Sequence, residues 1–315
     1  MAKLDLRVRV LGRALRRTSI VGQSTERILR NQQAKISHNR VTDLLLGGIA
    51  PGVTLTDGYA AGDGDRLRVR VYRPDTGRRT ALPLIVNFHG GGWVVGSLDT
   101  ADWLCSNVAA SVDAVVVSVD YRLAPTHRWP AAAEDCYAAL VDVTARAAEF
   151  GADPGRLAVI GDSAGGNLAA VTTLMARDRS GPAITFQGLI YPATDLTGSS
   201  PSVDENADAP VLTKADIIAY RDHYLGDADP AQPYASPLFA AHHGGLPRAL
   251  VQVAEHDPIR DDGLRYAAAL QAAGVPVRTT NYVGMPHGFL AFPRLCRSAP
   301  QALAELTTEL RSALS

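Results

Sequence analysis

Residues 161–166, Gly-Asp-Ser-Ala-Gly-Gly, constrain the fold of this chain more than any other stretch. An apolar run typical of a buried strand, 157–160, precedes them, and a helix-compatible run of small residues, 164–176, overlaps their end. Gly-x-Ser-x-Gly in this setting predicts a sharp strand-to-helix turn that lifts the serine hydroxyl clear of the sheet edge. Ser163 would then lie at a helix N-terminus, which favours developing negative charge, and it is a candidate nucleophile.

Apolar strand patterns alternate with helical patterns along most of the chain, whose 315 residues can form one large domain. The predicted strands are 53–61, 67–72, 84–88, 114–119, 157–160, 186–191, 250–254 and 277–283. The predicted helices are 99–111, 131–150, 164–176, 262–273 and 300–314. The first two strands form an antiparallel hairpin around the turn at 62–65. We therefore expect an α/β fold with a mostly parallel, mixed eight-stranded sheet flanked by helices.

Two segments interrupt this alternation. Within residues 1–50, one face of a helix is marked by Leu4, Val8, Leu11 and Leu15. The other face is rich in arginine, so this helix either docks over a protein cleft, which we favour, or lies on a membrane surface. Residues 196–235 are rich in Ser, Pro, Asp and Ala and hold one helical pattern, at 214–224. We expect a helical segment over 1–50 and a main domain over 51–315 with an insertion at about 196–235.

Composition narrows the class of protein. The formal net charge of −1 argues against nucleic acid as a partner, although residues 1–40 carry ten Lys/Arg against two Asp/Glu. Cys105, Cys136 and Cys296 lack metal-ligand spacing and indicate reduced thiols. There is no apolar signal-peptide core and no run of about 18 apolar residues, so we expect a cytoplasmic protein.

Two later residues can serve Ser163. A serine hydroxyl needs a base within hydrogen-bond reach, and the base needs a third group to fix its tautomer. Asp257 follows the predicted strand 250–254, and His287 follows the predicted strand 277–283. The order Ser, Asp, His at strand ends is that of a hydrolase triad, so all three side chains should meet at one sheet edge.

Each partner also has a purely structural interpretation. Asp257 precedes a proline and could be a turn residue, and His287 could be an ordinary loop histidine. The presence of both in the required order, each past a strand end, argues against coincidence. Glu255 is a rival carboxylate, ranked lower because it lies at the strand end itself.

A glycine-rich loop, His89-Gly90-Gly91-Gly92-Trp93, directly follows the predicted strand 84–88. Consecutive glycines leave backbone N–H groups unshielded, as the oxyanion of an acyl-transfer intermediate requires. A phosphate loop is excluded because Val95 stands where a glycine is needed. The acidic turn at 62–65 lacks calcium-ligand spacing. We expect no metal or organic cofactor.

Together these motifs resemble those of the hormone-sensitive-lipase-like carboxylesterases (bacterial family IV) of the α/β-hydrolase fold. The resemblance spans about residues 53–314 and rests on four motifs, His-Gly-Gly-Gly at 89–92, Gly-Asp-Ser-Ala-Gly-Gly at 161–166, Asp-Pro-Ile-Arg-Asp at 257–261 and His-Gly-Phe at 287–289. Asp-Tyr-Arg-Leu-Ala-Pro at 120–125 also resembles a family signature, but Thr126 stands where the family usually has Glu.

The resemblance implies the roles of the triad residues. Ser163 would be the nucleophile, His287 the general base and then acid, and Asp257 its orienting carboxylate. The resemblance also implies a helical cap built from the N-terminal residues and the 196–235 insertion.

The same resemblance assigns further site residues. The oxyanion donors would be the backbone N–H groups of Gly90, Gly91 and Ala164. Trp93 would form a wall of the substrate pocket, and Asp162 would lie beside it in a structural role.

We therefore expect a serine carboxylesterase acting on small-molecule esters with short to medium acyl chains. One alternative is a lipase with weak membrane-surface contact through residues 1–22. A second is a non-catalytic ligand-binding receptor on the same scaffold, which would have no need of an intact triad. The resemblance is also compatible with a homodimer.

Overall fold

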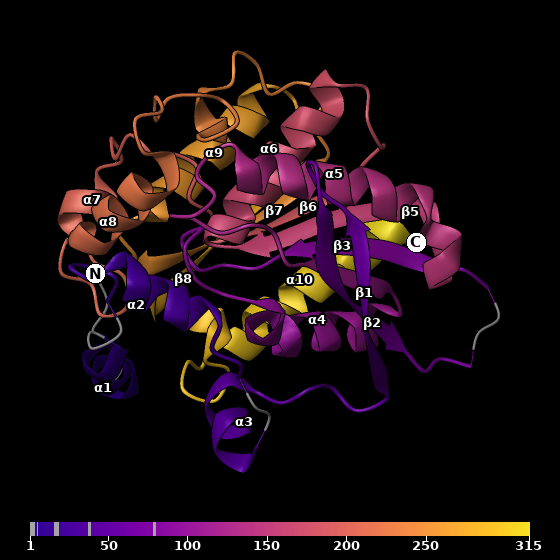
Figure 1. Ribbon diagram of the computed structural model, residues 1–315, viewed down its shortest axis with the longest axis horizontal. Helices are drawn as coiled ribbons and strands as arrows, with labels where there is room; N and C mark the ends of the chain where they lie inside the picture. Colours follow the sequence, from indigo (N-terminus) through magenta and orange to yellow (C-terminus); the bar gives the residue numbers. More distant parts are fainter. Residues whose placement is uncertain (1–3, 5, 16–18, 37–38, 78–79) are drawn as a thin grey trace.

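One mixed sheet forms the centre of the computed structural model, which describes residues 4, 6–15, 19–36, 39–77 and 80–315 (Figure 1). Its strand order is β1-β2-β4-β3-β5-β6-β7-β8. The strands are β1 Val53–Ala61, β2 Arg66–Pro74, β3 Leu82–Phe88, β4 Val115–Val119, β5 Ala152–Asp162, β6 Phe186–Ile190, β7 Arg248–His256 and β8 Val277–Pro286. β2 pairs antiparallel with β1 and β4, and the remaining pairs are parallel. The predicted mixed eight-stranded sheet is confirmed.

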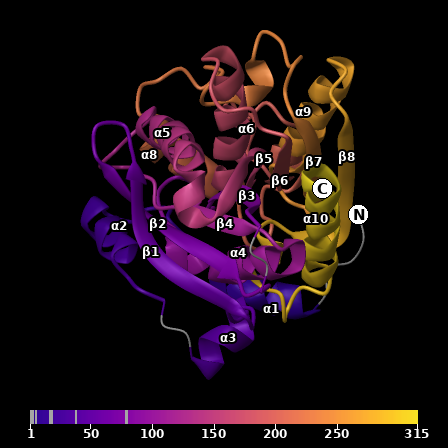
Figure 2. The ribbon, with the colours of Figure 1, turned by 90° about the vertical axis from the view of Figure 1, so that its right-hand side faces the viewer.

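Helices cover both faces of the sheet, on opposite sides of the strands in Figure 2. One face carries α5 Ala131–Ala145, α6 Ala164–Asp178 and α9 Arg260–Ala272, and the other carries α4 Leu98–Val112 and α10 Ala299–Leu314. Successive residues of β3 alternate between these faces: Leu84 and Val86 pack with the first group, and Ile85 with the second. Both faces of the sheet are therefore covered by apolar packing, as expected for a mostly parallel sheet.

The expected helix over 131–150 is divided in two. α5 ends at Ala145, and the 3-10 turn η2 Ala147–Phe150 follows it. Gly151, in the left-handed region at φ 66°, ends this turn. Further 3-10 turns in the described residues are η3 Pro237–Phe239 and η4 Phe289–Ala291.

Short helices precede β1 and fill the expected insertion. They are α1 Leu6–Leu15, α2 Thr25–Gln32, α3 Arg40–Leu46, α7 Ser202–Glu205 and α8 Lys214–Leu225. The sequence pattern did not predict α7, which is only four residues long. Thr213 caps α8 together with Asp216, and Ser19 donates a hydrogen bond to that same carboxylate. The N-terminal segment and the insertion therefore contact each other.

The apolar face of α1 packs against the rest of the protein. Val8 and Leu11 are buried, and Leu4 and Leu15 contact the same apolar cluster. A Cβ on Gly12 would come within 2.3 Å of Pro210, so this helix lies close on the insertion. Such packing is that of a docked helix rather than of one lying on a lipid surface. The basic residues Lys3, Arg16 and Arg17 lie outside the described residues.

Further expectations concern cysteines, membrane spans and metals. All three cysteines are buried thiols. No helix in the described ranges is long and apolar enough to cross a bilayer. Among the same residues, no three His, Cys, Asp or Glu side chains are grouped as metal ligands would be. The acidic turn at 62–65 closes the hairpin, with the Gly62 N–H donating to the Asp65 carbonyl at 2.7 Å.

Candidate active site

The serine turn is as sharp as its glycines predict. β5 ends at Asp162, α6 begins at Ala164, and Ser163 between them has φ 55° and ψ −119°. A Cβ on Gly161 would come within 2.2 Å of the Gly165 carbonyl oxygen, and one on Gly165 within 1.9 Å of the Phe88 oxygen. Only glycine fits at either position, because backbone meets backbone there.

Three side chains that are distant in sequence meet at this turn. The distance from Ser163 Oγ to His287 Nε2 is 2.8 Å, and that from His287 Nδ1 to Asp257 Oδ2 is 2.7 Å. The other Asp257 oxygen accepts from the Ile259 N–H at 2.9 Å, and the Asp257 side chain is fully buried. The carboxylate therefore faces the imidazole with both oxygens occupied, which fixes the ring with Nδ1 as donor and Nε2 toward the hydroxyl.

Strand register explains this convergence. Parallel β7 and β8 pair His256 with Pro286, so the residues that follow each strand, Asp257 and His287, leave the sheet side by side. The rival carboxylate Glu255 accepts instead from the Gly284 N–H at 2.8 Å. The structure thus brings together Ser163, Asp257 and His287 and leaves Glu255 on the backbone of β8.

In the glycine loop after β3, the expected role of Gly90 as an oxyanion donor does not agree with its hydrogen bonding. The Gly90 N–H donates to Asp162 Oδ1 at 2.9 Å, so it is engaged and is not a free oxyanion donor. Gly91, Gly92 and Ala164 line the cavity beside Ser163. In the described part of the chain, neither the Gly91 nor the Gly92 N–H has an acceptor. The sequence does not indicate which of the three adjacent glycine N–H groups faces the site. The answer depends on the acceptor Asp162, which is distant in sequence.

The cavity in front of Ser163 has a volume of about 340 Å³. Residues at the sheet edge, residues of α8 and Leu15 at the end of α1 line it, as do both expected pocket residues, Trp93 and Asp162. The other main lining residues are Leu15, Ser19, Tyr191, Leu196, Val211, Leu212, Asp216, Ile217, Tyr220, Ile259, Asp262 and Phe292. This lining is largely apolar with a few polar groups, as in small-molecule sites.

Sequence reasoning missed Tyr191 as a site residue. It lies one position after β6, at φ 35°, and its buried ring meets the His287 ring edge-on at a centroid distance of 4.9 Å. Its place just past a strand end, like those of Asp257 and His287, is the signal that could have identified it.

Asp162 links the two loops of the site. Burial raises the pKa of its carboxyl to about 6, and the hydrogen bond from Gly90 opposes that rise. Although Asp162 keeps some exposed surface in the cavity, the protein around it disfavours the charged form. His89 stabilises the same loop: its Nδ1 lies 2.8 Å from the Gly90 carbonyl oxygen, and burial lowers the pKa of the imidazole.

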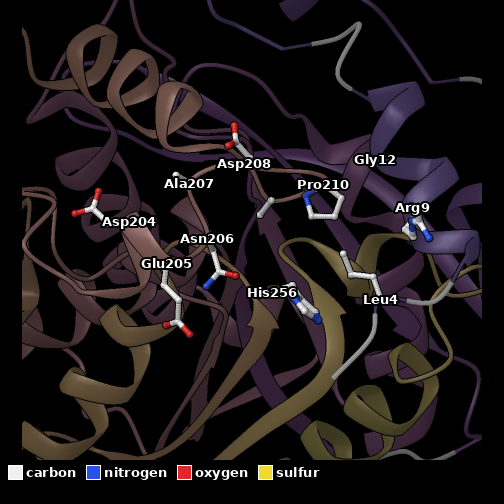
Figure 3. Close-up of a pocket in the computed structure, with 11 residues that line it drawn as sticks. Leu4, Arg9, Gly12, Asp204, Glu205, Asn206, Ala207, Asp208, Pro210 and His256 are labelled. Atoms are coloured by element: carbon white, nitrogen blue, oxygen red, sulfur yellow. The ribbon is translucent and has the colours of Figure 1, made fainter. Parts of the chain in front are cut away.

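A second, larger cavity of about 560 Å³ lies between the N-terminal segment and residues 204–210 (Figure 3). Figure 3 shows Asp204 and Glu205 on one side, Leu4 and Arg9 on the other, and His256 between them. Asp204 is paired with Lys214 and Glu205 with Arg260. None of the converging site residues lines this cavity, so we place the candidate active site in the smaller one.

Comparison with known proteins agrees with the fold. A family model of the alpha/beta hydrolase fold matches residues 85–291. Esterase LipI of Mycobacterium tuberculosis is 44% identical over 278 residues, covering 87% of each chain, and carboxylesterase NlhH of the same organism is 46% identical over 250 residues, covering 78% of each. The solved structure of a hyperthermophilic esterase from Pyrobaculum calidifontis covers 100% of both chains at 37% identity and a TM-score of 0.86.

The sheet order and the serine turn define the α/β-hydrolase class of fold. Given these matches, the chain belongs to the carboxylesterase family of that fold, which confirms the expected resemblance to the hormone-sensitive-lipase-like enzymes.

The raised pKa of Asp162 predicts a pH-dependent effect of Asp162→Asn. The folded protein keeps the Asp162 proton up to about pH 6, whereas the unfolded chain, with a pKa of 3.8, releases it earlier. Wild type should therefore lose free energy of unfolding relative to the variant as pH rises from about 4 to about 7, by up to about 3 kcal/mol. Urea unfolding of both proteins at the two pH values measures this, and a constant difference would contradict it.

Proposed function

We propose that this chain is a serine carboxylesterase with Ser163, His287 and Asp257 as its catalytic triad. The observation that carries the proposal is the continuous hydrogen-bond chain from Asp257 through His287 to Ser163 Oγ, which opens into a largely apolar cavity. The esterase names of the relatives support the same activity. The intact triad argues against a non-catalytic receptor, which would not need it.

The proposed reaction proceeds through an acyl-enzyme. His287 Nε2 accepts the proton of Ser163 as its oxygen attacks the ester carbonyl, and Asp257 stabilises the imidazolium that forms. The oxyanion is held by backbone N–H groups of Gly91, Gly92 and Ala164. His287 then gives its proton to the leaving alcohol, and water repeats the sequence to release the acid.

The proposed cap consists of the N-terminal helices and the 196–235 insertion, because residues from both line the cavity. Leu15 comes from α1, and Ile217 and Tyr220 come from α8. Because Val8 and Leu11 of α1 are buried, the packing favours a cap helix over the alternative of a lipase with residues 1–22 on a membrane.

Ser163→Ala should abolish hydrolysis of p-nitrophenyl butyrate, with a loss in kcat of at least about 10⁴-fold, because no other hydroxyl lies against His287 Nε2 in the described structure. Circular dichroism should show an unchanged fold. Ser111→Ala, at an exposed serine of α4, is the control and should keep wild-type activity. Near-wild-type turnover by Ser163→Ala would refute the proposal.

Amide substitutions can show which of the two carboxylates, Asp257 or Glu255, supports His287 in catalysis. Asp257→Asn keeps the shape but removes the charge beside His287, so kcat should fall by about 10³–10⁴-fold. Glu255→Gln leaves the acceptor for the Gly284 N–H, so kcat should change by less than about tenfold. Steady-state kinetics on one ester measures both, and the reverse ranking would show that Asp257 is wrongly assigned.

Cavity size favours short to medium acyl chains. A volume of about 340 Å³ is at the lower end of small-molecule sites, which span about 300–1,000 Å³. Across p-nitrophenyl esters from acetate to palmitate, kcat/KM should peak in the shorter half of the series and fall for palmitate. A maximum at palmitate would instead support the lipase alternative.

A further inference from the structure

Cap helix α8 packs directly on the glycine loop through two tyrosines one helical turn apart. Tyr224 stacks on Trp93 with ring centroids 4.5 Å apart and ring planes within 4° of parallel, and both rings are buried. Tyr220 lies against the neighbouring backbone, since a Cβ on Gly92 would come within 2.3 Å of its ring. Residues spaced by four share one helix face, so a single face of α8 contacts consecutive residues of the loop.

The loop needs such support because its backbone is unusual. Gly91, Gly92 and Trp93 have φ of 120°, 58° and 61°. The first two are glycines, for which these values are ordinary, but Trp93 is a bulky residue in the left-handed region. A conformation of this kind persists where surrounding contacts impose it. The stacked Tyr224 ring covers one face of the Trp93 side chain.

A second tie comes from the N-terminal segment. Gln32 Nε2, at the end of α2, donates to the carbonyl oxygens of Val94 and Ala124, both at 2.8 Å. The Ala124 N–H in turn donates to the Trp93 carbonyl at 2.9 Å. The two different cap segments therefore both contact this region: α8 contacts the loop itself, and α2 contacts Val94 directly after it and Ala124, which is bonded to Trp93.

Neither Tyr224 nor Gln32 lines the substrate cavity. Any influence they have on catalysis must therefore pass through the loop and not through contact with an ester. Oxyanion donors act only when held close to their required positions, and a displacement of about 1 Å can cost about 100-fold in rate.

We propose that the two cap segments set the geometry of the oxyanion loop, with Tyr224 and Gln32 as positioning residues. The cap is then part of the catalytic apparatus as well as a cover for the pocket. This inference rests on the proposed function, since the loop geometry matters for rate only if the Gly91 and Gly92 N–H groups hold an oxyanion.

Tyr224→Leu removes the stacked ring and is the first test. With p-nitrophenyl acetate, a substrate small enough to need little contact with the cap, kcat should fall about tenfold while KM stays within about twofold of wild type. Tyr224→Phe is the matched control: it keeps the ring and loses only a hydroxyl that has no hydrogen-bond partner in the described structure. Its kcat and KM should both stay within about twofold.

Gln32→Ala tests the second tie, with Gln33→Ala, an exposed neighbour, as control. Only the first should lower kcat, again with little change in KM. If Tyr224→Leu fails to fold, as judged by circular dichroism, the kcat of Gln32→Ala is the test of the inference.

Wild-type kcat in folded Tyr224→Leu and Gln32→Ala would overturn the inference, as would a raised KM with unchanged kcat, which would assign the cap to substrate binding only. If Ser163→Ala is inactive in the same assay, either outcome leaves the proposed esterase function standing. Full activity in Ser163→Ala would remove both.

Discussion

The site depends on the close approach of the first turn of α6 to the end of β3. Gly165 lies so near the Phe88 carbonyl that no side chain fits between them. Because the glycine loop begins at His89, directly after Phe88, this one contact places the Ser163 turn and the loop beside each other. The Gly90–Asp162 hydrogen bond then joins them on the other side. The backbone geometry of the site thus follows from packing that only glycine permits.

The two carboxylates of the site, Asp257 and Asp162, differ in their electrostatic surroundings. Asp257 faces the His287 imidazole and would balance the positive charge that the proposed reaction places on it. Asp162 faces a backbone amide and has no cation as a partner among its hydrogen bonds, which is consistent with its raised pKa. In the proposed reaction the first carboxylate stabilises the imidazolium, whereas the second joins the Ser163 turn to the glycine loop.

The proposed cap segments contact the glycine loop and the residues after it through aromatic rings and a side-chain amide, in addition to their apolar packing on the rest of the protein. α8 reaches the loop through Tyr220 and Tyr224, and α2 reaches it through Gln32. Ser19 and Asp216 connect the two cap segments to each other. In our proposal, the packing of these two cap segments therefore also sets the shape of the oxyanion loop, which a cap that contacted only the pocket rim would not do.

The sequence by itself determined the sheet, the serine turn and the order of Ser163, Asp257 and His287, because strand periodicity and turn chemistry are local and the strand ends share one edge. Only the tertiary structure decided which glycine amides face the cavity, since the Gly90 N–H is taken up by Asp162, a residue 72 positions away. It also placed Tyr191 against His287 and Tyr224 against Trp93. Such contacts depend on how distant segments pack, so the hydrophobic periodicity of either segment alone does not predict them.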